Sequence, residues 1–567
     1  ARALASLGVA RALALAPALA PPGAAVVLLE CGADRVTLVS DGRRETFRAE
    51  ALGANLREKC KDKRCGVAVC GARGVDFLRW LLRRGLADQS RAVDVHDVAL
   101  MRSALHGTVP SDSVPDAGTS VVEKEVLSLW SQLQDDEGAM NTYRLMIRAQ
   151  LATAAMELAG MPLDAGGLQA LVDHWRADLE AEEAEVRRLI ASVMSVAPGF
   201  NIRSAQQVAA AIASIVDAKM LASWPRTPGG QLRTDSDTLR RHGGSVPFAG
   251  GVAKCRELSH AISHYAPYVA ASKAGGGRLF STYRLGGCVT GRLSCSNPNI
   301  HATPRDPKFR RLVSVCELGS SRSARLVRGD FAQIELRVLA EEVAGDRRMR
   351  LAFAEGEDLH RVTAAALRDI DTAAVTDEDR QLAKAVNFGF VYGQSASGFQ
   401  QYAEANYGVE LTFDKAASLR RQFFEAYPEV AAWHGEQRQR VAKGEVLKTP
   451  SGRCAHHLRL GMSKALNFAE REALNFPIQG GAAEVTLACL DRLSHHLSSV
   501  WDKCRPICVV HDEFLLECAD MATAEVAASA LRLAMQEAWA QVFPSAPALG
   551  PSGACVSIGE NWAACKD

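Results

Sequence analysis

The sequence predicts a mixed α/β protein built from several domains. Its 567 residues exceed the roughly 100 to 200 that one domain usually has. Short apolar runs typical of β-strands alternate with longer segments whose apolar residues recur at helical spacing, in residues 25–100 and again after residue 280. No internal repeat of fixed period is visible, which argues against a solenoid.

The elements can be assigned in order. Residues 26–30 and 35–39 are expected to form two strands around a turn, and residues 76–86 an amphipathic helix. Residues 140–164 and 173–195 carry the apolar stripe of long helices. Strands and helices then alternate to the end of the chain.

Composition restricts the function classes. Lys and Arg number 66 against 65 Asp and Glu, so a polyanionic partner would need a local basic face. The 15 cysteines contain no CxxC pair, and we expect neither a disulfide scaffold nor a structural zinc site. No apolar stretch reaches the length of a membrane span, so we expect no membrane association.

The first 29 residues are rich in Ala, Leu and Pro and contain no acid before Glu30. Such a bias is typical of the end of an organellar transit peptide, and equally of an Ala/Pro linker. Two compartments stay open: an organelle, either plastid or mitochondrion, and a bacterial or phage cytoplasm.

Two aspartates lie where apolar strands are expected to end. Residues 325–330 (Arg-Leu-Val-Arg-Gly-Asp) are expected to form a short strand that ends at Asp330. Residues 506–518 are expected to form an apolar hairpin with His511, Asp512 and Glu513 at its turn. Buried acids are costly unless a cation compensates them, and two Mg²⁺ ions bridging Asp330 and Asp512 would do so. Taken alone, either aspartate is more often a surface or capping residue.

A helix between these segments carries cations and aromatic rings on one stripe. Arg380, Lys384, Phe388 and Tyr392 follow one another at intervals of four residues. The cations suit triphosphate oxygens and the rings suit a base or sugar. Taken alone, the helix could also be an ordinary amphipathic one with solvated cations.

Together, residues 330–337, 380–393 and 510–513 resemble, in order and spacing, the three polymerase motifs of DNA polymerase family A. Residues 290–294 with 297–299 resemble the family's primer-template contact, and residues 200–207 and 233–236 its thumb segments. The resemblance covers residues 140–562.

This resemblance implies a right-hand polymerase with palm, fingers and thumb, preceded by a ribonuclease H-like exonuclease-type domain. It implies these boundaries: a leader or linker at 1–24, a degenerate 3′–5′ exonuclease-like domain at 25–125, linker helix and thumb at 126–265, palm at 266–337 and 466–567, and fingers at 338–465. We expect no 5′ nuclease domain.

The resemblance also implies roles for individual residues. Asp330 and Asp512 would bind two Mg²⁺ ions, which Mn²⁺ can replace, with Glu513 as a supporting carboxylate. Lys384 would hold the triphosphate and protonate the departing pyrophosphate. The other nucleotide contacts would be Arg380, Phe388, Tyr392, Glu335, Gln333 and His360. The contacts to primer-template DNA would be Arg292, Asn299, Arg471, Asn475, Gln479 and His511.

The implied enzyme adds deoxynucleoside triphosphates to a DNA primer, as a monomer with or without a processivity factor, in replication or repair. Glu335 is placed where a ribose 2′ hydroxyl would project. Some residues depart from the family pattern: Phe331 and Ala332 replace Tyr and Ser, and residues 301–303 (His-Ala-Thr) replace Gln-Asn-Ile.

The amino-terminal segment lacks nuclease residues. Leu28 stands where the exonuclease has the first acid of its Asp-x-Glu pair, and Glu30 where it has the second. Asp76 and Asp94 are expected to cap or solvate helices rather than to bind metal. These positions predict that the domain has a structural role and no exonuclease activity.

Two other functions remain open. A single-subunit RNA polymerase shares two aspartates and a similar helix, although Glu335 and Phe388 argue against it. A silent DNA-binding or scaffolding protein is the other, although Asp330, Arg380, Lys384 and Asp512 are all present.

Overall fold

The computed structural model describes most of the chain after residue 127. The described segments are residues 24–26, 28–31, 35–40, 43–48, 65–69, 78–79, 93–106, 128–193, 200–227, 229–241, 244–315, 323–455 and 466–565. They form two compact units, one of residues 162–279 and one of the remainder.

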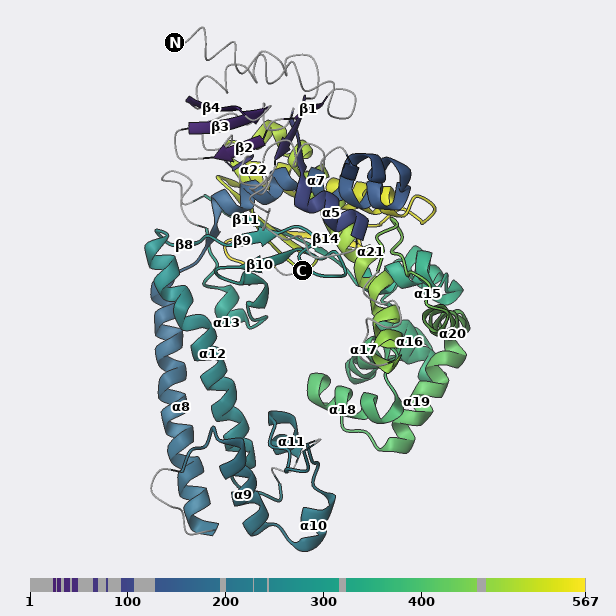
Figure 1. Ribbon diagram of the computed structural model, residues 1–567. Coiled ribbons are helices and arrows are strands. Elements are labelled where there is room, and N and C mark those ends of the chain that lie inside the picture. Colours follow the sequence, from purple (N-terminus) through teal and green to yellow (C-terminus); the bar gives the residue numbers. More distant parts are fainter. Residues whose placement is uncertain are drawn as a thin grey trace. The chain divides into compact units, whose positions relative to one another are not determined.

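A four-stranded antiparallel sheet, in the order β12-β13-β11-β14, is the centre of the larger unit (Figure 1). Its strands are β11 (Arg325–Phe331), β12 (Cys504–Val510), β13 (Glu513–Cys518) and β14 (Ala554–Gly559). Asp330 lies at the end of β11, and His511 and Asp512 form the turn between β12 and β13. The predicted strand and hairpin are therefore confirmed.

One face of this sheet is covered by helix α22 (Met521–Val542). A Cβ atom at Gly329 would lie 2.5 Å from Leu531 and 3.2 Å from the Met535 sulfur, so only glycine allows the helix to approach β11 this closely. Successive residues of a strand point to opposite faces, so Arg328 and Asp330 lie on the other face. That face is where the acids gather.

Two long helices connect the sheet to the rest of the unit. Helix α7 (Glu137–Ala159) packs against β12, and α21 (Leu466–His496) packs against both α7 and α22. These bounds confirm the long helix predicted at 140–164. At its other end, α21 contacts α14 (Ile334–Val338) and α20 (Pro428–Ala442) (Figure 1).

A helical subdomain follows β11. Its apolar core includes Phe390, Phe399, Phe423 and Trp433. After a π-helical turn at Leu339–Val343 it contains α15 (Arg347–Ala354), α16 (Leu359–Arg368), α17 (Asp377–Val391), α18 (Ala396–Tyr407), α19 (Phe413–Ala426) and α20. Thr376 and Asp379 form a capping box that fixes the start of α17.

The smaller unit consists of a pair of long helices and a helical tip. Helices α8 (Ala165–Val193) and α12 (Ala249–Ala274) lie side by side and antiparallel (Figure 1). A Cβ atom at Gly251 would lie 2.5 Å from Val186, so the helices approach closely there. The tip contains α9 (Ala205–Ile215), α10 (Ala218–Ser223) and α11 (Ser236–Arg241).

The amino-terminal segments contain two small sheets. Strands β1 (Ala24–Val26), β5 (Cys65–Val69) and β6 (Val93–Asp97) pair in parallel, and β2 (Leu28–Cys31), β3 (Arg35–Ser40) and β4 (Arg43–Arg48) pair antiparallel. The α/β character predicted for residues 25–100 is confirmed, whereas the side chains of Leu28 and Glu30 and the environment of Asp76 lie outside the described part.

Asp94 lies within β6, paired with Gly66, and its side chain lies outside the described part. Asp97 accepts hydrogen bonds from the amides of Ala99 and Leu100 and so caps the start of α5 (Val98–His106).

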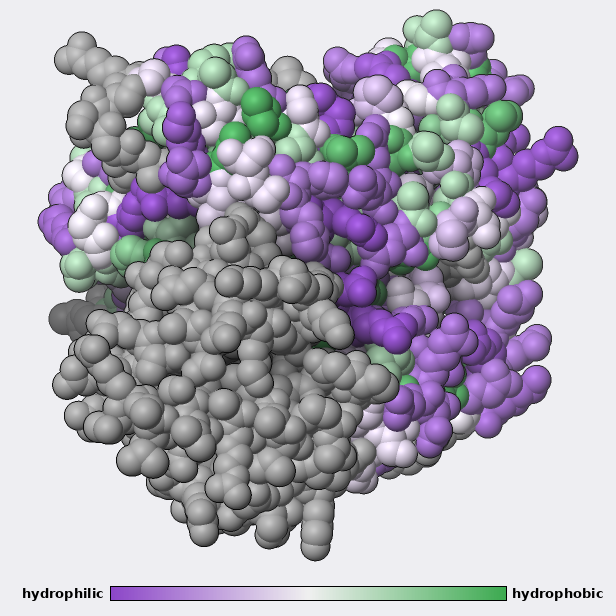
Figure 2. All heavy atoms as spheres, turned by 90° about the horizontal axis from the view of Figure 1, so that it is seen from above, coloured by the Kyte–Doolittle hydropathy of each residue, from purple (hydrophilic) through white to green (hydrophobic). Residues whose placement is uncertain are grey.

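Two short strand pairs accompany the larger sheets. They are β9 (Thr282–Arg284) with β10 (Ser294–Ser296), and a two-residue pair of β7 (Met161–Pro162) with β8 (Arg278–Leu279). Within the described segments, no helix has the length and hydropathy needed to cross a bilayer. The coloured part of the face in Figure 2 is largely hydrophilic, with small scattered hydrophobic groups.

A buried carboxyl group ties the loop at 447–455 to α21. Glu484 accepts hydrogen bonds from the Thr449 hydroxyl and, at 3.1 Å, from the Ser451 amide. Arg453 of this loop donates to the carbonyl of Val289, three residues before Arg292. Burial raises the pKa of Glu484 to about 7 despite these hydrogen bonds.

This raised pKa predicts a pH-dependent stability. The neutral carboxyl contributes stability that is complete below its ordinary pKa of 4.5 and is lost as the pH rises through about 7. We expect Glu484→Gln, whose amide stays neutral, to gain stability relative to the parent between pH 5 and pH 8, by an amount on the order of a few kcal/mol. Chemical denaturation at several pH values measures this, with the exposed Glu525→Gln as control. Parallel profiles for parent and Glu484→Gln would contradict the assignment.

Candidate active site

Strand pairing brings the predicted acids together. Asp330 on β11 pairs directly with Glu513 on β13, and the Phe331 amide lies 3.5 Å from the Asp512 carbonyl. Like charges directly opposite on neighbouring strands repel. Burial, together with the neighbouring Asp330, raises the pKa of Asp512 to about 7. Burial also raises the pKa of Asp330 to about 6, although Arg328 opposes the shift.

Glu513 behaves differently because cationic and polar donors surround it. Arg310 donates to its two oxygens at 3.2 and 3.0 Å, and the Trp562 indole donates at 2.6 Å. Arg328 contacts it as well, at 2.5 Å. Burial alone would raise the pKa of Glu513, but Arg328 and Arg310 outweigh it and hold the pKa below its ordinary value. Glu513 is therefore a stable anion, unlike the two aspartates.

Helix α17 carries the two predicted cations, Arg380 and Lys384. Arg380 donates to Asp358 at 2.5 Å, and Gln333 donates to the same carboxylate at 3.1 Å. Lys384 is half-buried, and burial followed by the nearby charges of Arg305 and Arg380 lowers its pKa. A lowered pKa makes an ammonium group a better proton donor.

His360 is buried against α17. Its ring nitrogen lies 2.9 Å from the Asn387 amide, and its ring packs 5.9 Å from that of Phe388. Burial lowers its pKa to about 4, so the ring is neutral. The predicted contact of His360 with the triphosphate stays a prediction.

Glu335 connects the end of α17 to the segment that contains Arg292. Its carboxylate accepts from the Tyr392 hydroxyl at the end of α17 and pairs with the Arg292 guanidinium. Burial and the adjacent Glu335 charge raise the pKa of Tyr392 well above its usual range, which keeps the hydroxyl a donor. Both partners restrict the Glu335 side chain to one position.

The remaining predicted DNA contacts lie on exposed or half-buried positions. Arg471, Asn475 and Gln479 follow at intervals of four along α21, with Arg471 exposed and the other two half-buried. His511 is exposed, and its ring lies 6.0 Å from that of His301. The exposed Asn299 accepts a hydrogen bond from the His301 amide and so caps a short helical turn.

Two residues of the site have a backbone conformation that L-residues rarely adopt. Gln333 has φ 55° two residues after the end of β11, and His511 has φ 60° in the turn before Asp512. Such conformations cost free energy and are found where function fixes a side chain. Gln333 lies three residues after Asp330, and His511 immediately precedes Asp512.

Motif matching missed four residues that the geometry brings in. They are charged or aromatic groups in segments outside the three motifs or beside them: Arg305, Arg310, Arg328 and Trp562. Arg305 is exposed and lies close enough to Lys384 and His511 to lower the pKa of each. The basic residues in 305–311 were the feature of the sequence that could have indicated this segment.

The acids fit the divalent ions that the resemblance implies. Asp330 and Asp512 offer hard oxygen donors, and their raised pKa values show that a cation between them would relieve repulsion and burial. Searched over the described segments alone, the chain has no group of three or more His, Cys, Asp or Glu side chains arranged to hold a metal. A pair of carboxylates suits Mg²⁺, which keeps places for water and phosphate oxygens.

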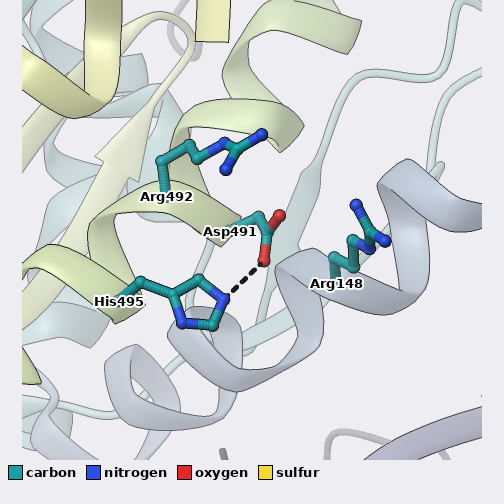
Figure 3. Close-up of a pocket in the computed structure, with 4 residues that line it drawn as sticks. All are labelled: Arg148, Asp491, Arg492 and His495. Atoms are coloured by element: carbon teal, nitrogen blue, oxygen red, sulfur yellow. Dashed lines mark ion pairs between the residues drawn. The ribbon is translucent and has the colours of Figure 1, made fainter. Parts of the chain in front are cut away.

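A separate pocket of about 380 Å³ lies on α7 and α21 (Figure 3). It is lined by Arg148, Asp491, Arg492 and His495, and His495 pairs with Asp491 at 3.4 Å. Arg492 also donates to Gln541 at 2.9 Å. None of the predicted site residues lines this pocket, so it is distinct from the candidate active site.

Comparison with known proteins identifies the family. The family described as DNA polymerase family A matches residues 169–564. The chain belongs to DNA polymerase family A. This family A chain is 31% identical over 376 residues to DNA polymerase I of Aquifex aeolicus, covering 66% of the chain and 60% of that relative. It is 30% identical over 453 residues to the thermostable DNA polymerase I of Thermus aquaticus, covering 78% of the chain and 51% of that relative.

A solved structure shows the same fold. The POL domain of Pol1 from M. smegmatis, in complex with DNA primer-template and dNTP, superposes with a TM-score of 0.76 and 23% identity, covering 95% of each chain. The family A chain thus has the polymerase architecture implied by its motifs. It spans only about half to six-tenths of the length of the curated relatives above.

Proposed function

We propose that this chain extends a DNA primer along a template with deoxynucleoside triphosphates. One observation carries the proposal: Asp330 and Asp512, from different segments of the sheet, lie together, with the Phe331 amide 3.5 Å from the Asp512 carbonyl and the neighbouring Asp330 raising the pKa of Asp512. Membership of family A supports it. The boundaries given above for palm, fingers and thumb are part of the proposal.

Two divalent ions held by Asp330 and Asp512 would activate the primer hydroxyl and stabilise the leaving oxygen. Arg380 would exchange its Asp358 partner for the triphosphate, because phosphate, like carboxylate, offers anionic oxygens to which a guanidinium binds strongly. Lys384, with its lowered pKa, would donate a proton to the departing pyrophosphate. The ring of Phe388, beside His360, would pack against the incoming nucleotide.

Primer-template DNA would lie along the exposed side of α21 and the turn at His511. Arg471, Asn475 and Gln479 present one polar stripe, which suits the universal acceptors of the minor groove. Arg292 would contact the same duplex while held by Glu335. A monomer is sufficient for this arrangement.

A primer-extension assay separates this function from the two alternatives. We expect the purified chain to extend a labelled DNA primer with deoxynucleotides and Mg²⁺ and to use ribonucleotides poorly. Preferred ribonucleotide use would indicate an RNA polymerase, and DNA binding without extension a silent binding protein. Without nucleotides the primer should keep its length, since the amino-terminal segment lacks the first exonuclease acid; shortening would contradict the inactive domain.

Removing either metal-binding carboxylate should abolish synthesis without loss of DNA binding. We expect Asp330→Asn and Asp512→Asn to lower kcat by about a thousandfold or more, because the ions act mainly in the transition state. Single-turnover kinetics and a DNA-binding titration measure the two properties. Asp502→Asn, an exposed acid outside the site, is the matched control. Extension by either site variant at the control's rate would remove the metal assignment.

Glu335 should exclude the ribose 2′ hydroxyl. We expect Glu335→Ala to raise ribonucleotide use relative to deoxynucleotide use at least about tenfold. The Glu335 side chain would leave the extra hydroxyl neither space nor solvent, and such a site discriminates strongly. Tyr392→Phe removes the hydroxyl that binds Glu335 but leaves the carboxylate and Arg292, so it should retain most of the discrimination. The ratio of kcat/KM values for the two sugars is the measurement. An unchanged ratio in Glu335→Ala would rule out this role.

A further inference from the structure

We propose that Arg328 is a positioning residue whose guanidinium occupies the position beside Asp330 that a divalent ion would take. When the ion binds, the guanidinium releases Asp330. This inference rests on the proposed metal role of Asp330. Arg328 lies outside the three polymerase motifs at residues 330–337, 380–393 and 510–513. Its side chain is 13% exposed, so water screens its charge little.

The geometry places Arg328 between two carboxylates. It lies two residues before Asp330 on β11 and therefore on the same face of the sheet. One nitrogen, Nη2, donates to Asp330 Oδ2 at 2.7 Å, and Nε donates to Glu513 Oε1 at 2.5 Å. A single guanidinium thus offsets the repulsion between two acids that face each other across the strands.

Glu513 anchors this guanidinium. Its two oxygens also accept from Arg310 and from Trp562, which hold the carboxylate in place. Arg310 in turn stacks 4.2 Å from the centre of the Trp562 ring. Arg328 can therefore release Asp330 and remain bound to Glu513, so the exchange needs no second partner for the arginine.

The consequence concerns metal affinity before DNA and nucleotide bind. A divalent ion that uses Asp330 Oδ2 has to displace a hydrogen bond and approach a fixed positive charge. At a distance of a few ångströms, a unit charge changes the affinity for a cation by an order of magnitude or more. The free protein should then bind divalent ions weakly.

The test measures Mn²⁺ binding to the DNA-free protein by electron paramagnetic resonance. We expect Arg328→Met to bind Mn²⁺ at least about tenfold more tightly than the parent. Arg325→Met is the matched control: it removes the same charge from the same strand, but Arg325 pairs with Glu560 at 3.7 Å. Equal affinities for the two Met variants would overturn the proposal.

Two further variants test whether the gain depends on the charge of Arg328 and on Asp330. Arg328→Lys keeps a charge beside Asp330 and should bind Mn²⁺ within about threefold of the parent; affinity as tight as that of Arg328→Met would overturn the proposal. Adding Asp330→Asn to Arg328→Met should abolish the gain, and a gain that persists would place the ion elsewhere and overturn the proposal. If Arg328→Met fails to fold, Arg328→Gln, which keeps hydrogen-bond donors without the charge, takes its place in every comparison, with Arg325→Gln as its control. None of these measurements needs synthesis, so a parent that does not extend primers would refute the proposed function separately.

Discussion

The site depends on placing like charges opposite each other at the end of one buried sheet. Asp330 and Glu513 are directly paired, and Asp512 precedes Glu513 by one residue. This arrangement is costly in an apolar setting and persists only because cations are built in around it. Arg310 and Arg328 neutralise Glu513, and Arg328 partly neutralises Asp330. Asp512 is left with a pKa raised to about 7.

The same cluster therefore separates three acids into two kinds. Glu513, with its lowered pKa, is satisfied by protein donors and serves as an anchor. Asp330 and Asp512, with raised pKa values, lack enough protein cations to ionise without cost. Groups whose environments push their pKa values apart have different roles at one site. The proposed function assigns the second kind to the binding of divalent ions.

Much of this could be predicted from sequence because strand ends and helical spacing are local properties. The end of β11 at Asp330, the hairpin turn at Asp512 and the α17 stripe were all expected in their observed places. The contacts of Arg310, Arg328 and Trp562 were not, since the partners of Glu513 lie 203, 185 and 49 residues away in the chain. Spacing within a motif says nothing of such pairs.

His360 and Asp97 show the same limit. The resemblance made His360 a candidate triphosphate contact, and only packing reveals that its ring is buried against Asn387 and Phe388. Asp97 reaches the free amides of α5, and residue type alone did not distinguish it from Asp94, three residues earlier. In both cases the residue type was compatible with two environments. Neighbours distant in sequence, or a shift of less than one helical turn, decided which environment the side chain has. Glu335 is the counterexample: its two partners, Arg292 and Tyr392, both belong to the segments by which the family was identified, so the motifs themselves contain the contact that holds it.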